Sequence, residues 1–300
     1  MKKEGIKMEK LKKGFYTALG TPLDENGNLI EESLRKHINQ QIDAGASGLL
    51  VMGSMGIEAT IKLSAYKDIV RVAADEVAGR VPLFVGAMDT SIVKVMEKIE
   101  AMKGAKIDGV VLTTPFYGVP NDESAIYFFK TIADKSPYPI YLYDLAVTVK
   151  YKMTIGVIDE LIKHDNIKGI KTADWELIHA IGRKYPEKNF ECLYSGLDSF
   201  DYANKMGIDK NLDGMFACTP KNGKKMFDCI NAGDFEGARA YLDNILLLRD
   251  TMLKYRIMSC FTYCMNLLGC KGNFHQDYVL LPTEEGLRVM EETMRKIGEI

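Results

Sequence analysis

The feature that most constrains this chain is a repeated alternation of short apolar segments with amphipathic ones. Eight runs have the length and composition of buried β-strands, and helical periodicity separates each from the next. Short strands that are apolar on both faces and separated by helices are typical of a parallel sheet covered by helices. Eight such units over about 220 residues predict a (β/α)8 barrel. The expected strands cover residues 14–19, 48–52, 82–86, 109–113, 139–143, 166–171, 190–194 and 213–218.

The residues after the eighth unit are helical by their period and carry no motif of their own. We expect a barrel over residues 1–220 and appended helices over 221–300, with helices at 234–248, 251–268 and 283–300. The competing architecture, a doubly wound sheet that binds a dinucleotide, requires a GxGxxG turn and an acidic residue about 20 positions later. The glycine-rich turn at 53–56 lacks that spacing, so a dinucleotide site is not expected.

Composition excludes several classes of function. The chain has 300 residues and a formal net charge of −2, which gives no electrostatic footprint for nucleic acid or an anionic membrane. Its apolar runs are too short to cross a bilayer, and its charged N-terminus lacks the apolar segment of a signal peptide. No histidine is spaced to complete a zinc site with Cys260 and Cys264. We therefore expect a cytoplasmic protein with reduced cysteines and no metal.

Lys171 ends the sixth apolar segment. Desolvation of an ammonium group lowers the pKa of a lysine toward neutrality, and a neutral amine can attack a carbonyl. The alternative interpretation is that Lys171 marks the point where the strand reaches solvent. The local pattern favours this second interpretation, whereas the arrangement of the rest of the chain favours the first.

Other chemically useful residues follow strand ends: Ser54, Tyr117, Tyr143 and Gly196. In a barrel, the carboxyl ends of all strands contribute to one shared site. This set contains no histidine, carboxylate pair or metal ligands, so Ser-His-Asp and metal-assisted chemistry lack their groups. An imine of Lys171 with a ketone, once protonated, is an electron sink for making or breaking a neighbouring C–C bond. Phenols can perform the proton transfers that this chemistry requires.

Each of these residues also has a purely structural interpretation. Tyr143 could pack inside the barrel, Tyr117 could pack within its proline-flanked loop, and Ser54 could be an ordinary turn residue. Three histidines are expected on helices away from the strand ends, at the surface or partly buried: His37, His164 and His179.

The order and spacing of the strand-end motifs resemble the dihydrodipicolinate synthase / N-acetylneuraminate lyase family of Schiff-base aldolases. The resemblance runs from about Gly14 to Thr219 and more loosely through the helical tail. The family motifs GTTGE (or GSTGE), PYY, YNxP, GIK and SGxD correspond here to Gly53-Ser54-Met55-Gly56-Ile57, Pro115-Phe116-Tyr117, Tyr143-Asp144-Leu145-Ala146, Gly169-Ile170-Lys171 and Ser195-Gly196-Leu197-Asp198.

The resemblance implies roles for the matched residues. Lys171 would form the imine with a 2-oxo acid, so no separate cofactor is expected, and an aldehyde would be the second partner. Tyr143 would shuttle the proton, oriented by the Ser54 hydroxyl and by Tyr117 from a neighbouring subunit, which implies a homodimer or homotetramer. The backbone amides of the glycine-rich turn would hold the carboxylate. The expected substrate contacts are Ser54, Met55, Gly196, Leu197 and the backbone near Phe216.

Departures from the family motifs bear on the substrate. Met55 replaces a turn hydroxyl, and the family glutamate falls on Ile57 or, with a shift of one residue, on Glu58. Thr148 replaces the arginine that binds a second carboxylate in dihydrodipicolinate synthases. Loss of that arginine removes a charge-assisted contact worth about 1.5–3 kcal/mol, which argues against the lysine-biosynthesis enzyme.

The motif of the sialic-acid lyases is also altered. Ser199 replaces the glutamate of their Asp-Glu pair, and Met215 replaces the serine after Gly214. Together with Leu197, Met55 and Ile57, these changes predict a less polar pocket and an apolar or short aldehyde. Two functions remain open: an active class I aldolase or lyase, and a binding or regulatory descendant that holds a 2-oxo acid without turnover. Retention of Lys171, Tyr143, Ser54 and Tyr117 favours the first.

Overall fold

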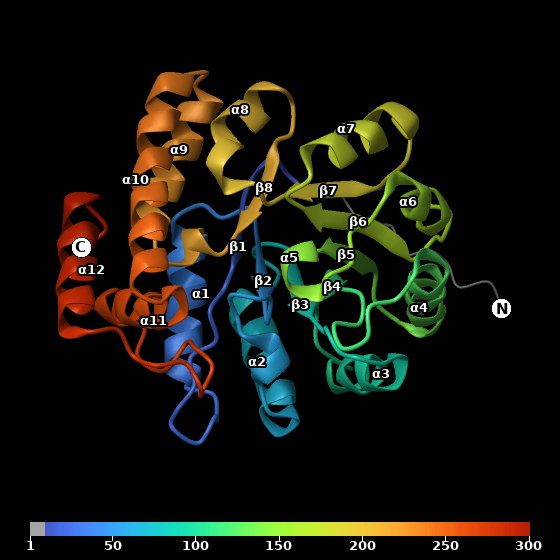
Figure 1. Ribbon diagram of the computed structural model, residues 1–300, viewed down its shortest axis with the longest axis horizontal. Helices are drawn as coiled ribbons and strands as arrows, with labels where there is room; N and C mark the ends of the chain where they lie inside the picture. Colours follow the sequence, from blue (N-terminus) through green and yellow to red (C-terminus); the bar gives the residue numbers. More distant parts are fainter. Residues whose placement is uncertain (1–9) are drawn as a thin grey trace.

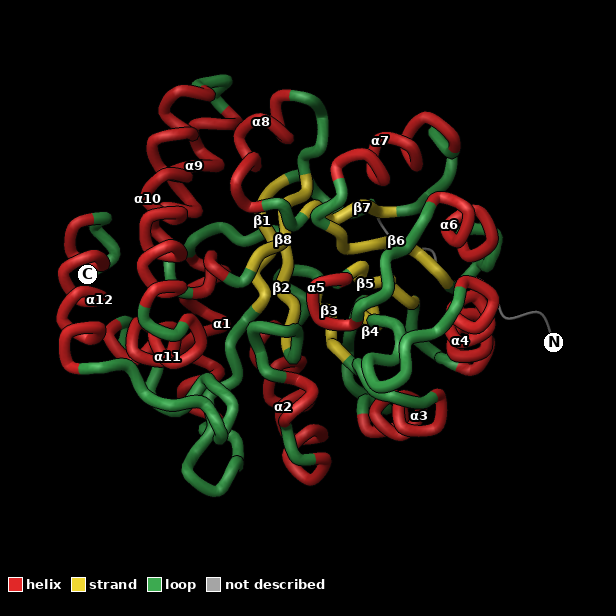
Figure 2. Tube along the Cα trace, in the orientation of Figure 1, coloured by secondary structure: helices red, strands yellow, loops and turns green. Residues whose placement is uncertain are grey.

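A computed structural model describes residues 10–300 and contains a closed barrel of eight parallel strands in chain order. The barrel closes because β1 pairs with β8. Figure 1 and Figure 2 show the strands at the centre, with helices around them. This confirms the predicted (β/α)8 barrel. The strands are β1 Gly14–Ala18, β2 Gly48–Val51, β3 Leu83–Gly86, β4 Gly109–Leu112, β5 Ile140–Asp144, β6 Ile167–Thr172, β7 Glu191–Tyr194 and β8 Lys210–Asp213.

Helices connect the strands and then extend the chain beyond the barrel. Those of the barrel are α1 Glu31–Asp43, α2 Leu63–Val77, α3 Ile92–Ala101, α4 Asp122–Lys135, α5 Ala146–Val149, α6 Ile155–Leu161, α7 Trp175–Lys184 and α8 Phe200–Lys205. The later helices are α9 Pro220–Asn231, α10 Phe235–Lys254, α11 Ile257–Leu267 and α12 Glu284–Lys296. Short 3-10 turns are η1 Glu58–Thr60, η2 Leu197–Ser199 and η3 Met215–Ala217. In Figure 1, α10 to α12 form a group beside the barrel.

Two apolar layers stabilise the barrel. One fills its interior and includes Tyr16, Phe84 and Tyr141, and the other lies between the strands and the surrounding helices. The Tyr141 ring needs glycine on both neighbouring strands. A Cβ at Gly109 or at Gly169 would lie 2.7 Å from that ring, closer than real Cβ atoms approach. The glycine of Gly169-Ile170-Lys171 is therefore required by packing.

The predicted eighth strand is misplaced. Residues 213–218 were expected to form it, but β8 covers Lys210–Asp213 and the apolar run continues as η3. The Asp213 carboxylate accepts a hydrogen bond from the Met215 N–H at 2.7 Å, which turns the chain out of the sheet. The sequence does not indicate this strand because its first and last residues are charged. Lys210 forms an ion pair with Glu191, 3.3 Å away, and only the structure reveals this partner.

The helical tail also differs from the prediction. A break was expected between 248 and 251, but α10 continues to Lys254, and the chain turns at Arg256, whose φ is 74°. The last helix ends at Lys296 rather than at 300. α10 packs against α9 as well as α12, and the division into units 1–220 and 221–300 stays a prediction. Within residues 10–300, no helix has the length and apolar character needed to cross a membrane.

Candidate active site

Lys171 and Tyr143 face each other on adjacent strands. They are register partners of β5 and β6. The Lys171 Nζ donates a hydrogen bond to the Tyr143 hydroxyl at 3.0 Å and lies 4.2 Å from the centroid of its ring. Each residue is only 5% exposed. The strand-end lysine is thus removed from bulk water and paired with a phenol, the arrangement that imine chemistry needs.

A cavity of about 520 Å³ lies at the carboxyl ends of the strands and contains this pair. Its volume is typical of a site for a small molecule. Its lining comes from the ends of β5, β6, β7 and β8 and from the loop that contains α5: Tyr143, Asp144, Leu145, Ala146, Val147, Lys152, Lys171, Ala173, Asp174, Ser195 and Asp213. The barrel therefore places the lysine, one phenol and several carboxylates around one space.

Charged side chains form part of the cavity lining. Three aspartates line it, and Lys152 forms ion pairs with two of them, Asp144 and Asp174. Thr148, at the position of the family arginine, is exposed in α5. Among residues 10–300, no arginine lines this cavity. The less polar pocket expected from the sequence stays a prediction.

The glycine-rich turn after β2 has a strained backbone and is followed by a buried ion pair. Met52 and Ile57, which flank it, have φ values of 52° and 51°, in the left-handed region that residues other than glycine rarely adopt. Glu58 is 1% exposed, and the Lys98 Nζ donates to it at 2.7 Å. Burial raises the pKa of Glu58 to about 7, and the charge of Lys98 limits the rise. Glu58 is thus a buried acidic residue at the end of this turn, paired with Lys98.

The turn does not contact Tyr143 in the way that the family roles imply. Ser54 is exposed, and among residues 10–300 no hydrogen bond joins its hydroxyl to that of Tyr143. Met55 packs against the barrel interior, and a Cβ at Gly214 would lie 2.8 Å from its Cε. The methionine therefore takes part of the space above β8.

Tyr117 lies in the loop after β4 and is 87% exposed. Phe116 and Val119 beside it are 36% and 55% exposed. Among residues 10–300, Tyr117 forms no hydrogen bond with Tyr143. A role for Tyr117 in the site of a neighbouring subunit stays a prediction. The exposed side chain is accessible to such a neighbour.

The remaining predicted contacts surround the seventh and eighth strands. The Tyr194 hydroxyl packs against Gly196, and a Cβ added at Gly196 would lie 2.2 Å from it. Leu197 and Phe216 are buried in the layer between the strands and the helices. Asp198 accepts two hydrogen bonds from Arg249 of α10, at 2.6 and 2.9 Å, and its side chain remains 70% exposed.

Of the residues that line the cavity, sequence reasoning assigned only Tyr143 and Lys171 to the site. The polar lining residues that it missed are Asp144, Lys152, Asp174, Ser195 and Asp213. Asp144 could have been identified as a site residue from the sequence, because it replaces the asparagine of the family motif YNxP. Nothing local distinguishes Lys152 from the other charged residues of its segment, since its partners come from different strand ends.

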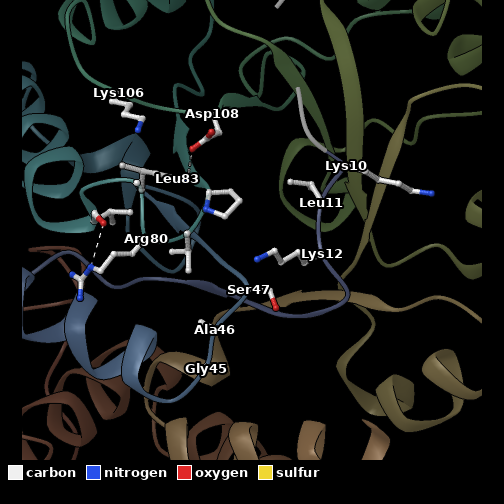
Figure 3. A pocket seen from close by; sticks show the side chains of 14 residues that line it. Lys10, Leu11, Lys12, Gly45, Ala46, Ser47, Arg80, Leu83, Lys106 and Asp108 are labelled. Atoms are coloured by element: carbon white, nitrogen blue, oxygen red, sulfur yellow. Dashed lines mark hydrogen bonds between the residues drawn. The ribbon is translucent and has the colours of Figure 1, made fainter. Parts of the chain in front are cut away.

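A second cavity, of about 580 Å³, lies at the other end of the barrel. Figure 3 shows Lys12 and Lys106 with Ser47 and Asp108, beside residues that precede β2, β3 and β4. These positions are at the amino ends of the strands, away from Lys171. Catalytic groups of (β/α)8 barrels lie at the carboxyl ends, so this cavity is not the candidate site.

Comparisons with known proteins agree with this geometry. The model of the dihydrodipicolinate synthetase family matches residues 11–296. The 4-hydroxy-tetrahydrodipicolinate synthase of Rhodopseudomonas palustris (strain BisA53) is 28% identical over 263 residues, which cover 86% of this chain and 87% of that protein. The enzyme of the same name from Ligilactobacillus salivarius (strain UCC118) is 29% identical over 263 residues, with coverages of 85% and 88%.

Solved structures share the fold. Dihydrodipicolinate synthase from Thermotoga maritima superimposes with a TM-score of 0.87 at 20% identity, covering 97% of this chain and 100% of that one. CdNal from Clostridium difficile, solved in complex with mannosamine, gives 0.86 at 22% identity, with coverages of 95% and 99%. Since the family match spans nearly the whole chain, the protein belongs to the dihydrodipicolinate synthetase family.

Proposed function

We propose that this protein is a class I aldolase or lyase in which Lys171 condenses with pyruvate or another 2-oxo acid. The observation that carries the proposal is the buried Lys171 amine, 3.0 Å from the Tyr143 hydroxyl at the carboxyl end of the barrel. Members of the family are lyases or aldolases that use a lysine imine. No separate cofactor takes part, because the imine itself is the electron sink.

The proposed reaction uses the two residues in sequence. The lone pair of the Lys171 amine forms a C–N bond to the keto carbon, and the carbonyl oxygen takes a proton from Tyr143. The nitrogen then gives a proton to the Tyr143 phenolate, and Tyr143 passes it to the new hydroxyl, which leaves as water and gives the protonated imine. The Tyr143 phenolate takes a proton from the adjacent carbon to give an enamine, whose electron pair attacks the aldehyde carbon while Tyr143 returns the proton to the aldehyde oxygen. Water finally hydrolyses the imine and releases Lys171.

We propose further that the protein is neither a dihydrodipicolinate synthase nor a sialic-acid lyase. Support for the first exclusion is Thr148, which offers no charge for a second carboxylate. Support for the second is the altered motif, in which Ser199 and Met215 stand where the sialic-acid lyases have a glutamate and a serine. A homodimer or homotetramer, in which Tyr117 completes a neighbour's site, and a cytoplasmic location are parts of the same proposal.

Borohydride trapping tests the function. Protein, pyruvate and reductant should give one pyruvate-derived adduct per chain, which Lys171→Ala abolishes. Lys168→Ala, on the same strand, is the matched control and should retain the adduct. Trapping together with C–C bond formation or cleavage on an aldehyde panel supports the aldolase.

A second candidate is a protein that binds a 2-oxo acid without turnover. It is favoured by one observation, the exposed Ser54 without a hydrogen bond to Tyr143 among residues 10–300. Trapping without any aldol activity would support this candidate, whereas failure to trap would contradict both.

A further inference from the structure

Lys152 enters the cavity from the loop between α5 and α6, and its side chain is 46% exposed. Its ammonium group pairs with Asp144 and lies 2.9 Å from Asp174 Oδ2. An ammonium group has three N–H donors. One donor therefore remains without a partner among residues 10–300, in a group that lines the same space as Lys171.

Both aspartates are fixed in place by further bonds. Asp144 accepts hydrogen bonds from Thr172 Oγ1 at 2.8 Å and from the Met153 N–H at 3.1 Å. Asp144 and Thr172 are register partners directly after the Tyr143–Lys171 pair. Asp174 Oδ1 caps α7 by accepting from the Leu177 N–H at 2.8 Å. Lys152 is therefore held in a defined position relative to the reacting amine.

The charges of this cluster decide which groups it can bind. Two aspartates and one lysine leave one net negative charge, and Asp213 lines the same cavity. A carboxylate would meet an ammonium that is already neutralised and would be repelled by its partners. A hydroxyl group can accept from the remaining N–H of Lys152 and donate to Asp174, whose side chain is 27% exposed.

We infer that Lys152, held between Asp144 and Asp174, selects the second substrate, and that it selects an uncharged hydroxyaldehyde over an aldehyde with a carboxylate. The inference rests on the proposed function, because it assumes that an enamine on Lys171 receives this aldehyde. It narrows the choice of aldehyde beyond the apolar or short aldehyde expected from the sequence.

The test compares two four-carbon aldehydes, erythrose and succinic semialdehyde, each with pyruvate. Wild-type kcat/KM should favour erythrose by about tenfold or more, the range for a hydrogen bond to a charged group. Lys152→Met should lower kcat/KM for erythrose by about tenfold or more, mainly through KM, and leave pyruvate trapping at Lys171 unchanged. Lys152→Gln provides the same measurement where the methionine variant does not fold.

Asp174→Asn should shift the preference toward the carboxylate. Asparagine caps a helix as well as aspartate does, so the fold is retained, while the cluster becomes neutral and Lys152 becomes available to a carboxylate. The ratio of kcat/KM for erythrose to that for succinic semialdehyde should fall by about tenfold. Lys150→Met is the matched control. Lys150 lies on the same loop and donates to the Val147 carbonyl at 2.7 Å without lining the cavity, so its loss should leave the ratio unchanged.

Three results would overturn the inference while leaving the imine intact. They are a wild-type preference for succinic semialdehyde, an unchanged ratio in both Lys152→Met and Asp174→Asn, and trapping of pyruvate at Lys171 with turnover of neither aldehyde. Absence of trapping would instead contradict the proposed function, and this inference with it.

Discussion

At the scale of single residues, the Lys171 amine lies 3.0 Å from the Tyr143 hydroxyl, and each side chain is 5% exposed. The sequence indicates this pair because a strand-end lysine and a strand-end phenol are visible without coordinates. It could not predict that Asp144 and Asp174 hold Lys152, because that bridge joins the end of β5, the start of α7 and the loop between α5 and α6. Nor could it show that His37 is fully buried rather than partly exposed, because helix periodicity does not reveal what packs on the outer layer.

Tyr143→Phe tests the proton transfer. Imine trapping at Lys171 should persist, because the amine remains, but turnover should fall by roughly 10²–10⁴-fold, the usual range for an acid–base residue. Steady-state kinetics and mass spectrometry provide the two readouts. Tyr141→Phe is the control, since the Tyr141 hydroxyl is buried without a hydrogen-bond partner among residues 10–300. Equal rates in the Tyr143 variant and wild type would remove Tyr143 from this role.

His37 should make stability depend on pH. Its side chain is fully buried, and burial lowers its pKa from 6.5 to about 3. Between these values the unfolded chain binds a proton that the folded chain does not, so stability decreases as pH falls below about 6.5. The slope should approach about 1.4 kcal/mol per pH unit.

Urea unfolding at several pH values measures this slope. His37→Phe, which keeps an aromatic ring beside Phe274, should unfold with a slope smaller by that amount. Parallel curves for the variant and the wild type would show that His37 does not titrate on unfolding.

At the scale of elements, periodicity located seven of the strands well, because each is a short apolar run bounded by turn residues. β8 was misplaced because only Leu212 of its four residues is apolar and because a more apolar segment follows it. The predicted break between α10 and α11 lies too early in the chain. The chain turns at Arg256, which has a left-handed conformation, and no glycine marks this position in the sequence.

Packing around Tyr141 gives an element-scale prediction. A methyl group added by Gly169→Ala would lie 2.4 Å from the Glu191 carbonyl oxygen and 2.7 Å from the Tyr141 ring. Overpacking of this kind should cost about 1–3 kcal/mol of unfolding free energy and reduce trapping at Lys171, two residues away. Gly182→Ala in α7 meets nothing within 4 Å and should be neutral or stabilising by up to about 1 kcal/mol. Chemical denaturation that ranks the two variants in the opposite order would contradict this packing account.

At the scale of the whole molecule, the alternation of strands and helices was sufficient to predict the barrel, and the barrel was sufficient to bring strand-end residues together. Assembly is a different matter. Tyr117, Phe116 and Val119 are exposed in the loop after β4, and neither sequence periodicity nor the structure of one subunit determines whether a neighbouring subunit covers them.

Subunit mixing tests the proposed role of Tyr117. Lys171→Ala and Tyr117→Phe proteins should each have little aldolase activity alone. After they are unfolded and refolded together, hybrids should regain activity, because a Lys171 from one subunit meets a Tyr117 from the other. Full activity of Tyr117→Phe alone, or no recovery on mixing, would contradict a contribution across an interface.

The central claim is that one buried amine forms a covalent bond with a keto acid. Peptide-mapping mass spectrometry of protein reduced in the presence of pyruvate tests it most directly. We predict the pyruvate-derived mass on Lys171 and on no other lysine of the chain. An adduct on surface lysines without Lys171, or no adduct at all, would contradict the account.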